Sequence, residues 1–267
     1  MQQAILITGA SSGIGKATAQ LFADRGWNVI ATMRSPEKEQ DLTEHPQVLV
    51  TRLDVLDPSS INEAITAGVE RFGRIDALVN NAGYGAYGPL EAFDREGILR
   101  QFNTNVIGLL DVTRAILPHF RAQGAGTLVN ISSIGGRMTF PLGALYHGSK
   151  FAVEGISEAL THELKAIGGR VKIIEPGIVA TDFGGRSFDL RLGEEMTEYQ
   201  PAVSAMMKGF QRAAPNASQP SLIAEVIHTA VTDGTDQLRY PAGADAEELL
   251  AMRAKMDDRS FMAMMEG

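Results

Sequence analysis

The sequence contains no cysteine. Disulfide bonds and thiolate metal sites are therefore excluded, and a metal ion would have to be held by histidine and carboxylate side chains alone. The five histidines are scattered along the chain, and no two of them show the spacing of metal ligands: His45, His119, His147, His162 and His228. The composition predicts a protein without a metal centre.

The sequence also lacks an excess of basic residues and any long apolar run. It has 24 Lys and Arg against 32 Asp and Glu, a net charge of −8, whereas binding to a phosphate backbone needs a basic face. No apolar run is long enough to span a bilayer, and the N-terminus has neither the positive region nor the cleavage site of a signal peptide. We therefore expect a cytoplasmic protein that binds no nucleic acid and does not span a membrane.

What the sequence does contain is a regular alternation of short β-branched runs and helical segments. This alternation is typical of βαβ units and a parallel sheet. The predicted strands are Ala4–Thr8, Asn28–Met33, Val48–Asp54, Ala77–Asn81, Thr127–Ser132, Val171–Glu175 and Leu238–Pro241. The predicted helices are Ile14–Arg25, Ser59–Phe72, Arg95–Phe120, Ala144–Ala166 and Pro220–Thr232. A chain of 267 residues suits one α/β domain better than two.

One long segment, between Pro176 and Pro220, interrupts the alternation. It shows no clear strand, two adjacent glycines (Gly184 and Gly185) and a Met-rich amphipathic piece around Ala205–Phe210. Long insertions in a compact domain are usually lids or binding loops. The apolar residues of this segment exceed what a solvated loop would carry: Phe183, Phe188, Leu190, Leu192, Tyr199, Met206, Met207 and Phe210. We predict that residues 181–220 form a lid over an apolar substrate; the alternatives are an ordinary surface loop or permanent packing on a neighbouring subunit.

The C-terminal segment from Ala244 carries apolar residues at helical spacing, namely Leu249, Leu250, Met252 and Met256. This spacing predicts a helix with one apolar face. We expect that face to pack on the core or on a subunit partner and not to bind a cofactor.

A glycine-rich turn follows the first predicted strand and leads directly into the first helix. Its residues are Gly9, Ser11, Ser12, Gly13, Ile14 and Gly15. Three glycines in this position allow a tight turn, a close approach of the backbone to a pyrophosphate, and close packing of helix on strand. The free N–H groups and the dipole at the helix start favour the negative charge of a phosphate. The turn predicts a dinucleotide site.

The spacing Gly-x-x-x-Gly-x-Gly resembles that of the short-chain dehydrogenase/reductase family. The resemblance continues through Asp54, Asn80-Asn81-Ala82-Gly83, Asn105, Ser133, Tyr146-x-x-x-Lys150 and Pro176-Gly177, and it covers roughly residues 4–182. It implies an α/β fold, a single-domain Rossmann-like doubly wound parallel sheet flanked by helices, assembled as a homodimer or homotetramer. The segments Ala31–Arg34 and Tyr146–Ala152 also look like the hydroxysteroid- and retinol-type branch.

The end of the second predicted strand bears on the choice of cofactor. An NAD site normally places a carboxylate there to hold the ribose hydroxyls, but this strand ends Ala31-Thr32-Met33-Arg34. Arg34 can instead bind a 2′-phosphate, which a carboxylate would repel. We therefore expect NADP(H); the alternative is that Arg34 is a solvated surface residue.

The resemblance implies further cofactor contacts. Asp54 would meet the adenine ring edge, and Asn81, with Ala82 and Gly83, would lie along the cofactor. The turn at Pro176 and Gly177, with Val179 and Thr181, would also bind the cofactor. Asn80-Asn81-Ala82-Gly83 is equally a strand-ending turn, and the two interpretations are compatible.

Tyr146 and Lys150 lie four residues apart on one predicted helix and so share a face. A free tyrosine has a pKa of about 10, and a nearby ammonium together with a positive nicotinamide ring would favour the phenolate. In the family, a Ser at the spacing of Ser133 stabilises the substrate oxygen; Ser132 is the neighbouring candidate. Asn105 matches the family residue that positions a water leading to the lysine, and alone it would be interpreted as a polar residue satisfying a helix kink.

These residues together predict an oxidoreductase that interconverts a carbonyl and an alcohol with NADP(H). Ser133 and Tyr146 would hold the oxygen, Tyr146 would transfer the proton, and Lys150 would bind the nicotinamide ribose. Two alternatives are an NAD-dependent alcohol dehydrogenase and a non-catalytic NADP(H) sensor. The complete Ser–Tyr–Lys set argues against the sensor.

Overall fold

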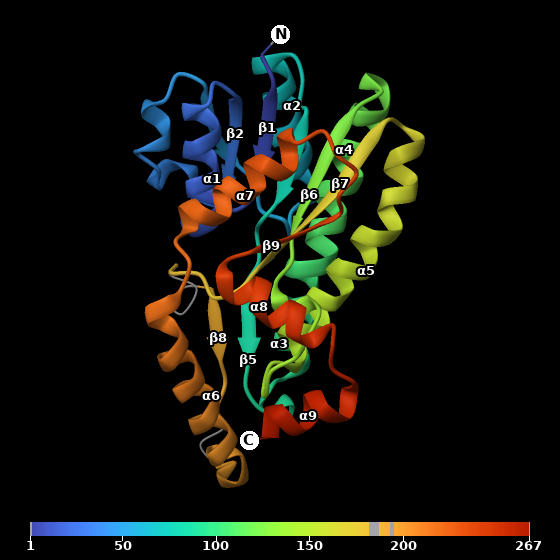
Figure 1. Cartoon of the computed structure of the whole chain (residues 1–267). Coiled ribbons are helices and arrows are strands. Elements are labelled where there is room, and N and C mark those ends of the chain that lie inside the picture. Colours follow the sequence, from blue (N-terminus) through green and yellow to red (C-terminus); the bar gives the residue numbers. More distant parts are fainter. Residues whose placement is uncertain (1, 182–186, 193–194, 267) are drawn as a thin grey trace.

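A seven-stranded sheet forms the centre of the protein (Figure 1), whose computed structural model describes residues 2–181, 187–192 and 195–266. The strand order is β3-β2-β1-β4-β6-β7-β9, and every neighbouring pair is parallel. The strands are β1 (Ala4–Ile7), β2 (Asn28–Met33), β3 (Val48–Arg52), β4 (Ala77–Asn80), β6 (Gly126–Ile131), β7 (Gly169–Pro176) and β9 (Arg239–Ala242). The doubly wound parallel sheet expected from the sequence is confirmed.

Helices cover both faces of the sheet (Figure 1). On one face lie α1 (Gly13–Asp24) and α7 (Pro220–Thr232); on the other lie α2 (Pro58–Phe72), α4 (Gly108–Gln123) and α5 (Ala144–Ala166). The side chains of β1 alternate between the two layers, since Ile5 packs in the cluster of Phe22 and Leu6 in that of Phe120. The side chains of both layers are buried from solvent, as expected for central strands that are apolar on both faces.

Local signals define the ends of α2. The Asp57 carboxylate accepts hydrogen bonds from the N–H groups of Ser59 and Ser60 at 3.1 and 3.4 Å, and Pro58 occupies the first turn. Gly73 ends the helix in the left-handed region, with φ +79°. These are the preferred N-cap and C-terminal residues of helices, and they define where α2 begins and ends before the chain enters β4.

The single helix predicted over Arg95–Phe120 is wrong in one respect. The structure divides it into α3 (Arg95–Phe102), a π-helical turn at Asn103–Ile107, and α4. The Gly108 N–H bonds the carbonyl of Asn103, five residues back. A π turn adds one residue to a helix and is short and rare, so a prediction from apolar periodicity over the whole segment passes over it.

The segment predicted as a lid contains more regular structure than its sequence indicates. A short strand, β8 (Phe188–Leu190), pairs in parallel with β5 (Gly85–Tyr87), and α6 (Gln200–Ala213) follows. The expectation of no strand is therefore wrong, because a three-residue strand pairing far along the chain leaves no periodic signal. Phe183, Gly184 and Gly185 lie outside the described residues. Arg100 pairs with Asp189, and Arg191 with Asp94 at 3.0 Å.

The chain ends in two helices, α8 (Ala244–Arg253) and α9 (Asp258–Glu266). Leu249, Leu250 and Met252 lie in α8 and are partly buried, and Ala246 is fully buried. The helix ends at Arg253, so Met256, also partly buried, lies beyond it and the predicted helical spacing does not extend that far. α8 begins directly after β9, at the carboxyl edge of the sheet (Figure 1). Within the described ranges, no helix is both long and apolar enough to cross a membrane.

Candidate active site

The glycine turn between β1 and α1 depends on each of its three glycines. Gly9 and Gly13 have φ values of +69° and +54°, a region that side chains disfavour. A Cβ on Gly15 would lie 2.4 Å from the Gly9 carbonyl oxygen. The N-cap of α1, Ser12, makes no side-chain capping bond, so the first N–H groups of this helix remain available to an anion.

Asn81 holds this turn in place. Its amide nitrogen donates to the carbonyls of Thr8 and Gly9 at 2.9 and 3.1 Å. The Thr8 hydroxyl in turn accepts from the N–H groups of Asn81 and Ala82, both at 3.0 Å. Asn81 thus joins the end of β4 to the glycine turn, the structural role that the sequence left open. Thr8 is a site residue that sequence reasoning missed; a hydroxyl at the end of a buried strand was the available signal.

Arg34, the residue predicted to bind the 2′-phosphate of the cofactor, directly follows β2. Arg34 is exposed, and in the described part of the chain it has no ion-pair partner. Lys16, by contrast, is held by Glu39 at 3.0 Å and Asp41 at 2.6 Å. Asp54 follows the neighbouring strand β3, and its carboxylate accepts from the Leu56 N–H at 3.0 Å. Arg34 and Asp54 therefore lie at the carboxyl ends of adjacent strands.

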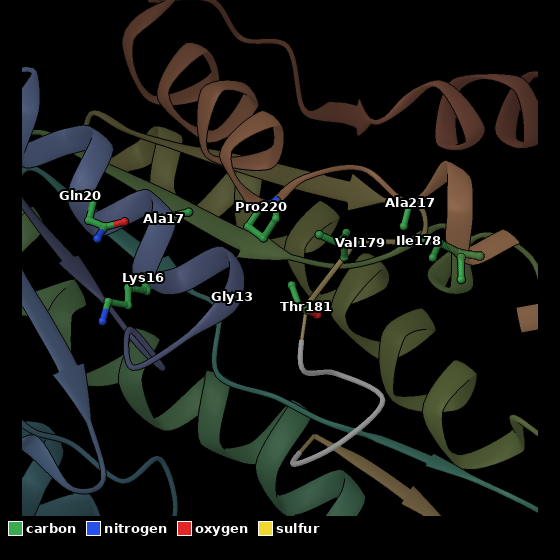
Figure 2. A pocket seen from close by; sticks show the side chains of 11 residues that line it. Gly13, Lys16, Ala17, Gln20, Ile178, Val179, Thr181, Ala217 and Pro220 are labelled. Carbon is green, nitrogen blue, oxygen red and sulfur yellow. The ribbon is translucent and has the colours of Figure 1, made fainter. Parts of the chain in front are cut away.

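The turn after β7 lies against the glycine turn (Figure 2). A Cβ on Gly13 would be 3.1 Å from the Thr181 methyl group, and Val179 forms a β-bridge with Ser218. A cavity of about 720 Å³ opens here. Its lining comes from α1, the turn and the start of α7: Gly13, Lys16, Ala17, Gln20, Ile178, Val179, Ala180, Thr181, Ala214, Ala217 and Pro220. Tyr146 and Ser133 are not among the lining residues, so the cavity lies beside the glycine turn and not over the Ser133 and Tyr146 hydroxyls.

Asp245, in the first turn of α8, holds the turn that follows β7 at Gly177 and Ile178. Its carboxylate accepts from the Ile178 N–H at 2.7 Å, and a Cβ on Gly177 would lie only 2.1 Å from the same oxygen. The Gly177 N–H donates to the carbonyl oxygen of Ala242 at 3.2 Å. Sequence reasoning missed Asp245, because its partner lies 67 residues away along the chain.

The structure brings Ser133, Tyr146 and Lys150 together. Ser133 follows β6 and caps a short 3-10 turn, with its hydroxyl accepting from the Gly135 N–H at 3.0 Å. Ser133 and Tyr146 share a side-chain hydrogen bond. The Lys150 ammonium lies 5.8 Å from the centre of the Tyr146 ring and donates to the Ile131 carbonyl at 2.8 Å. Two hydroxyls and a cation thus meet at the carboxyl end of β6.

Burial dominates the pKa values of this group. It raises the pKa of Tyr146, against the lowering effect of the Ser133 hydrogen bond. It lowers the pKa of Lys150 to about 8, and the Glu154 carboxylate opposes that shift. The expected lowering of the Tyr146 pKa involves the positive nicotinamide ring as well as the Lys150 ammonium, and it stays a prediction.

Asn105 is buried in the π turn and is fully engaged there. Its amide oxygen accepts from the Tyr84 N–H at 3.0 Å, and its nitrogen donates to the Tyr84 carbonyl at 2.8 Å. The same nitrogen reaches the Ser149 hydroxyl at 3.1 Å. These bonds match the interpretation of Asn105 as a residue that satisfies a helix distortion. The water-positioning role remains a prediction.

An aromatic wall, formed by Tyr87, Phe188 and Phe210, stands beside Tyr146. The Tyr87 ring lies 5.4 Å from that of Tyr146, 5.2 Å from that of Phe188 and 5.8 Å from that of Phe210. Burial raises the pKa of Tyr87 well above its ordinary value. Tyr87 was missed from the sequence because β5 is too short to recognise. The wall gives the reaction centre an apolar side.

Comparison with known proteins identifies the family. A model described as short chain dehydrogenase matches residues 3–190. The chain belongs to the short-chain dehydrogenases. An uncharacterized oxidoreductase of Schizosaccharomyces pombe is 48% identical, covering 86% of this chain and 97% of the relative. The 17-beta-hydroxysteroid dehydrogenase type 1 of Mus musculus is 33% identical, covering 88% of this chain and 72% of the relative. As a short-chain dehydrogenase, the protein is an oxidoreductase of small molecules.

Solved structures of short-chain dehydrogenases share the fold. One from Streptomyces avermitilis matches with a TM-score of 0.86 at 32% identity, covering 100% of this chain and 96% of the other. ElxO with NADP bound matches with a TM-score of 0.74 at 28% identity, covering 90% and 95%. A 3-ketoacyl-(acyl-carrier-protein) reductase from Brucella melitensis, complexed with NADH, matches at 0.77 and 26%, covering 91% and 98%. The comparisons support a nicotinamide dinucleotide as cofactor.

Replacing Asp245 tests its hold on the turn at Ile178. Asp245→Ala leaves the Ile178 N–H without its charged acceptor, and we expect the Kd for NADPH, measured by fluorescence titration, to rise about tenfold, the equivalent of 1.4 kcal/mol. Asp245→Asn keeps an oxygen acceptor and should lose less. Asp236→Ala, at an exposed carboxylate paired only with Arg170 at 3.5 Å, is the control. An unchanged Kd for NADPH in Asp245→Ala would contradict the proposed role of Asp245 in holding the turn at Ile178 for the cofactor.

Proposed function

We propose that this short-chain dehydrogenase reduces the carbonyl group of an apolar substrate to an alcohol with NADPH, and catalyses the reverse oxidation with NADP⁺. The observation that carries the proposal is the hydrogen-bonded pair of Ser133 and Tyr146 with Lys150 one helical turn further on. The pair lies at the carboxyl edge of a parallel sheet, where ligands of this fold class bind. Few arrangements of these three side chains serve packing alone, since burying two hydroxyls and an ammonium is costly.

The residues present fit a dinucleotide. Positive φ at Gly9 and Gly13 and the uncapped start of α1 make a cradle for a pyrophosphate. Arg34 is exposed and not neutralised by a described carboxylate, which favours the additional phosphate of NADP(H). Asp54 would meet the adenine edge, and Val179 and Thr181 the nicotinamide end. When bound, the cofactor supplies or accepts the hydride.

The side chains divide the remaining work. Ser133 and Tyr146 hold the substrate oxygen with two hydroxyl donors aimed at the place where negative charge develops. Because burial raises the pKa of Tyr146, the phenol keeps its proton at neutral pH and can donate it to that oxygen. Lys150, with a pKa of about 8, is mostly cationic at neutral pH. Its charge would bind the ribose and stabilise the phenolate that the proton transfer leaves behind.

The aromatic wall supports an apolar substrate. Phe188 and Phe210 belong to the predicted lid and pack on Tyr87, which in turn contacts Tyr146. An apolar group attached to the carbonyl would gain from burial against these rings. The name of the mouse relative, a hydroxysteroid dehydrogenase, points in the same direction. Cytoplasmic location and assembly into two or four copies stay predictions.

One alternative has support of its own. A related structure holds NADH, so an NAD-dependent alcohol dehydrogenase remains a rival. Oxidation of NADPH and of NADH, followed with a panel of aliphatic, aryl and steroid ketones, distinguishes the possibilities. The proposal requires turnover with a higher kcat/KM for NADPH. Turnover only with NADH would establish the rival, and NADPH binding without any turnover would establish a sensor.

The lid gives a separate prediction. If described residues 187–192 and 195–220 close over the substrate, their amide hydrogen exchange should slow at least about tenfold when NADP⁺ and an apolar alcohol are both present, since closure buries their backbone. The amides of the last turn of α2, at the opposite edge of the sheet from the site, are the internal control. Full protection of the segment in the protein alone would instead favour permanent packing against another subunit.

A further inference from the structure

His147 follows Tyr146 directly and is almost completely buried, with 2% of its surface exposed. Both of its ring nitrogens meet main-chain groups. Nδ1 lies 3.0 Å from the Gly135 carbonyl oxygen, and the Phe140 N–H donates to Nε2 at 3.1 Å. A carbonyl can only accept and an N–H can only donate. The ring must therefore be neutral, with its proton on Nδ1.

The main chain leaves room for this ring at two glycines. A Cβ on Gly135 would lie 2.8 Å from Nδ1 of His147, and a Cβ on Gly143 would lie 2.5 Å from Nε2. The His147 N–H also donates to the Gly143 carbonyl at 2.8 Å. The loop between Ser133 and α5 is therefore wrapped around the imidazole, and the ring is the only polar side chain in the described structure that bonds both Gly135 and Phe140.

Gly135 connects the imidazole to the candidate catalytic group. Its N–H donates to the Ser133 hydroxyl at 3.0 Å, and its carbonyl accepts from His147 at 3.0 Å. A glycine has no side chain to restrict its φ and ψ angles. The two hydrogen bonds, one on each side of Gly135, restrict them instead. The direction in which the Ser133 hydroxyl is held thus depends on the histidine.

Acid–base catalysis by His147 itself is excluded by the same bonds, because neither nitrogen is free to reach a substrate. The ring packs against Tyr146 at 5.5 Å and Tyr87 at 5.9 Å. These are the titratable side chains that it contacts, and burial raises the pKa of both, so each is uncharged at neutral pH. Burial also lowers the pKa of His147, against the hydrogen bond to Gly135. All the neighbours therefore suit a neutral ring.

We propose that His147 is a positioning residue for the reduction: through Gly135 it orients the Ser133 hydroxyl, and through ring contact it fixes Tyr146. The inference rests on the proposed function. It assigns to the Nδ1–H···O bond a role in turnover, and to the Nε2 bond with Phe140 only a role in holding the loop. The two bonds can be separated by substitution.

Two amide side chains each mimic one half of the imidazole. In His147→Asn, the amide nitrogen takes the place of Nδ1 and can donate to Gly135. In His147→Gln, the amide reaches the place of Nε2 and can accept from Phe140, but the bond to Gly135 is lost. His147→Phe keeps a ring and loses both bonds. His162→Phe, at an exposed histidine of the same helix, is the matched control.

We expect kcat to fall about hundredfold in His147→Gln and His147→Phe, the loss that a small misplacement of a reacting group produces, and to stay within about fivefold in His147→Asn. The Kd for NADPH should stay within about twofold in every variant, and thermal melting confirms that each is folded. If His147 served only to stabilise the fold, kcat would instead fall in proportion to the decrease in Tm of each variant, whichever of the two hydrogen bonds that variant keeps. Equal kcat in His147→Asn and His147→Gln would overturn the proposal.

A measurement on the unmodified protein is independent of turnover. The ¹⁵N shifts of the His147 ring, assigned with His147→Asn, should report a neutral ring protonated at Nδ1 from about pH 8 down to about pH 5.5, below the ordinary histidine pKa of about 6.5. Protonation near 6.5 or a proton on Nε2 would overturn the inference. Absence of turnover with every carbonyl would count against the proposed function, and the ring shifts would still test the histidine.

Discussion

Tyr146→Phe is expected to lower kcat about a thousandfold while the Kd for NADPH stays within about twofold. The substitution keeps the ring and its contact with Tyr87, 5.4 Å away, but removes the hydroxyl that is proposed to donate the proton beside Ser133. General acid catalysis by a positioned side chain contributes typically 10²–10⁴-fold, and removing it affects the transition state more than cofactor binding. Steady-state kinetics and a fluorescence titration with NADPH measure the two quantities.

Tyr199→Phe is the matched control: Tyr199 is exposed, its hydroxyl bonds the Glu91 carboxylate, and the substitution keeps the ring that the predicted lid contributes. We expect that variant to keep kcat within about twofold. If Tyr146→Phe retained activity within about tenfold of the parent, Tyr146 would not be the proton donor and the proposed mechanism would be wrong.

Arg34→Asp is expected to reduce the preference for NADPH over NADH, taken as the ratio of the two kcat/KM values, by about hundredfold. A hydrogen bond to a charged group contributes about 1.5–3 kcal/mol, and the new carboxylate would also repel the 2′-phosphate while offering an acceptor to ribose hydroxyls. Arg34→Gln removes the positive charge without adding a repelling one. Its ratio of kcat/KM for NADPH to that for NADH should lie between the ratios of the parent and of Arg34→Asp.

Arg114→Asp makes the same change of charge at an exposed position of α4, with 81% of the arginine side chain accessible. It separates a specific contact from the effect of net charge, and it should leave the ratio unchanged. A ratio unaffected by Arg34→Asp would mean that Arg34 is a solvated surface residue, the alternative that its exposed position also allows.

The sheet and its flanking helices could be predicted because their signals are local. Strands β1 and β4 are short, largely apolar runs followed by turn residues, and α2 carries its own caps at Asp57 and Gly73. The single helix over Arg95–Phe120 was wrong at Asn103–Ile107. There the side chain of Asn105 bonds the main chain of Tyr84, a contact of 21 residues' separation that no local pattern contains.

The two-stranded sheet of β5 and β8 shows more clearly that local sequence patterns do not predict contacts between distant segments. Gly85–Tyr87 and Phe188–Leu190 are each three residues long, and they become strands only by pairing with each other although the partners Gly85 and Phe188 lie 103 residues apart in the sequence. Neither has a period that a sequence could display. Their pairing nevertheless places Phe188 on Tyr87 and so builds the aromatic wall beside Tyr146.

The sequence by itself determined the fold class and predicted the glycine turn and the Tyr146–Lys150 pair, because these depend on local patterns and on fixed spacings within single elements; Ser133 was predicted from the spacing of the family that the sequence resembles. Only the tertiary structure decided how that group is held. The bond from Lys150 to Ile131, the two bonds of His147 and the tie from Asp245 to Ile178 all join separate elements. It also decided the pKa of Tyr146, since desolvation depends on what surrounds a side chain in three dimensions and not on its neighbours in the sequence.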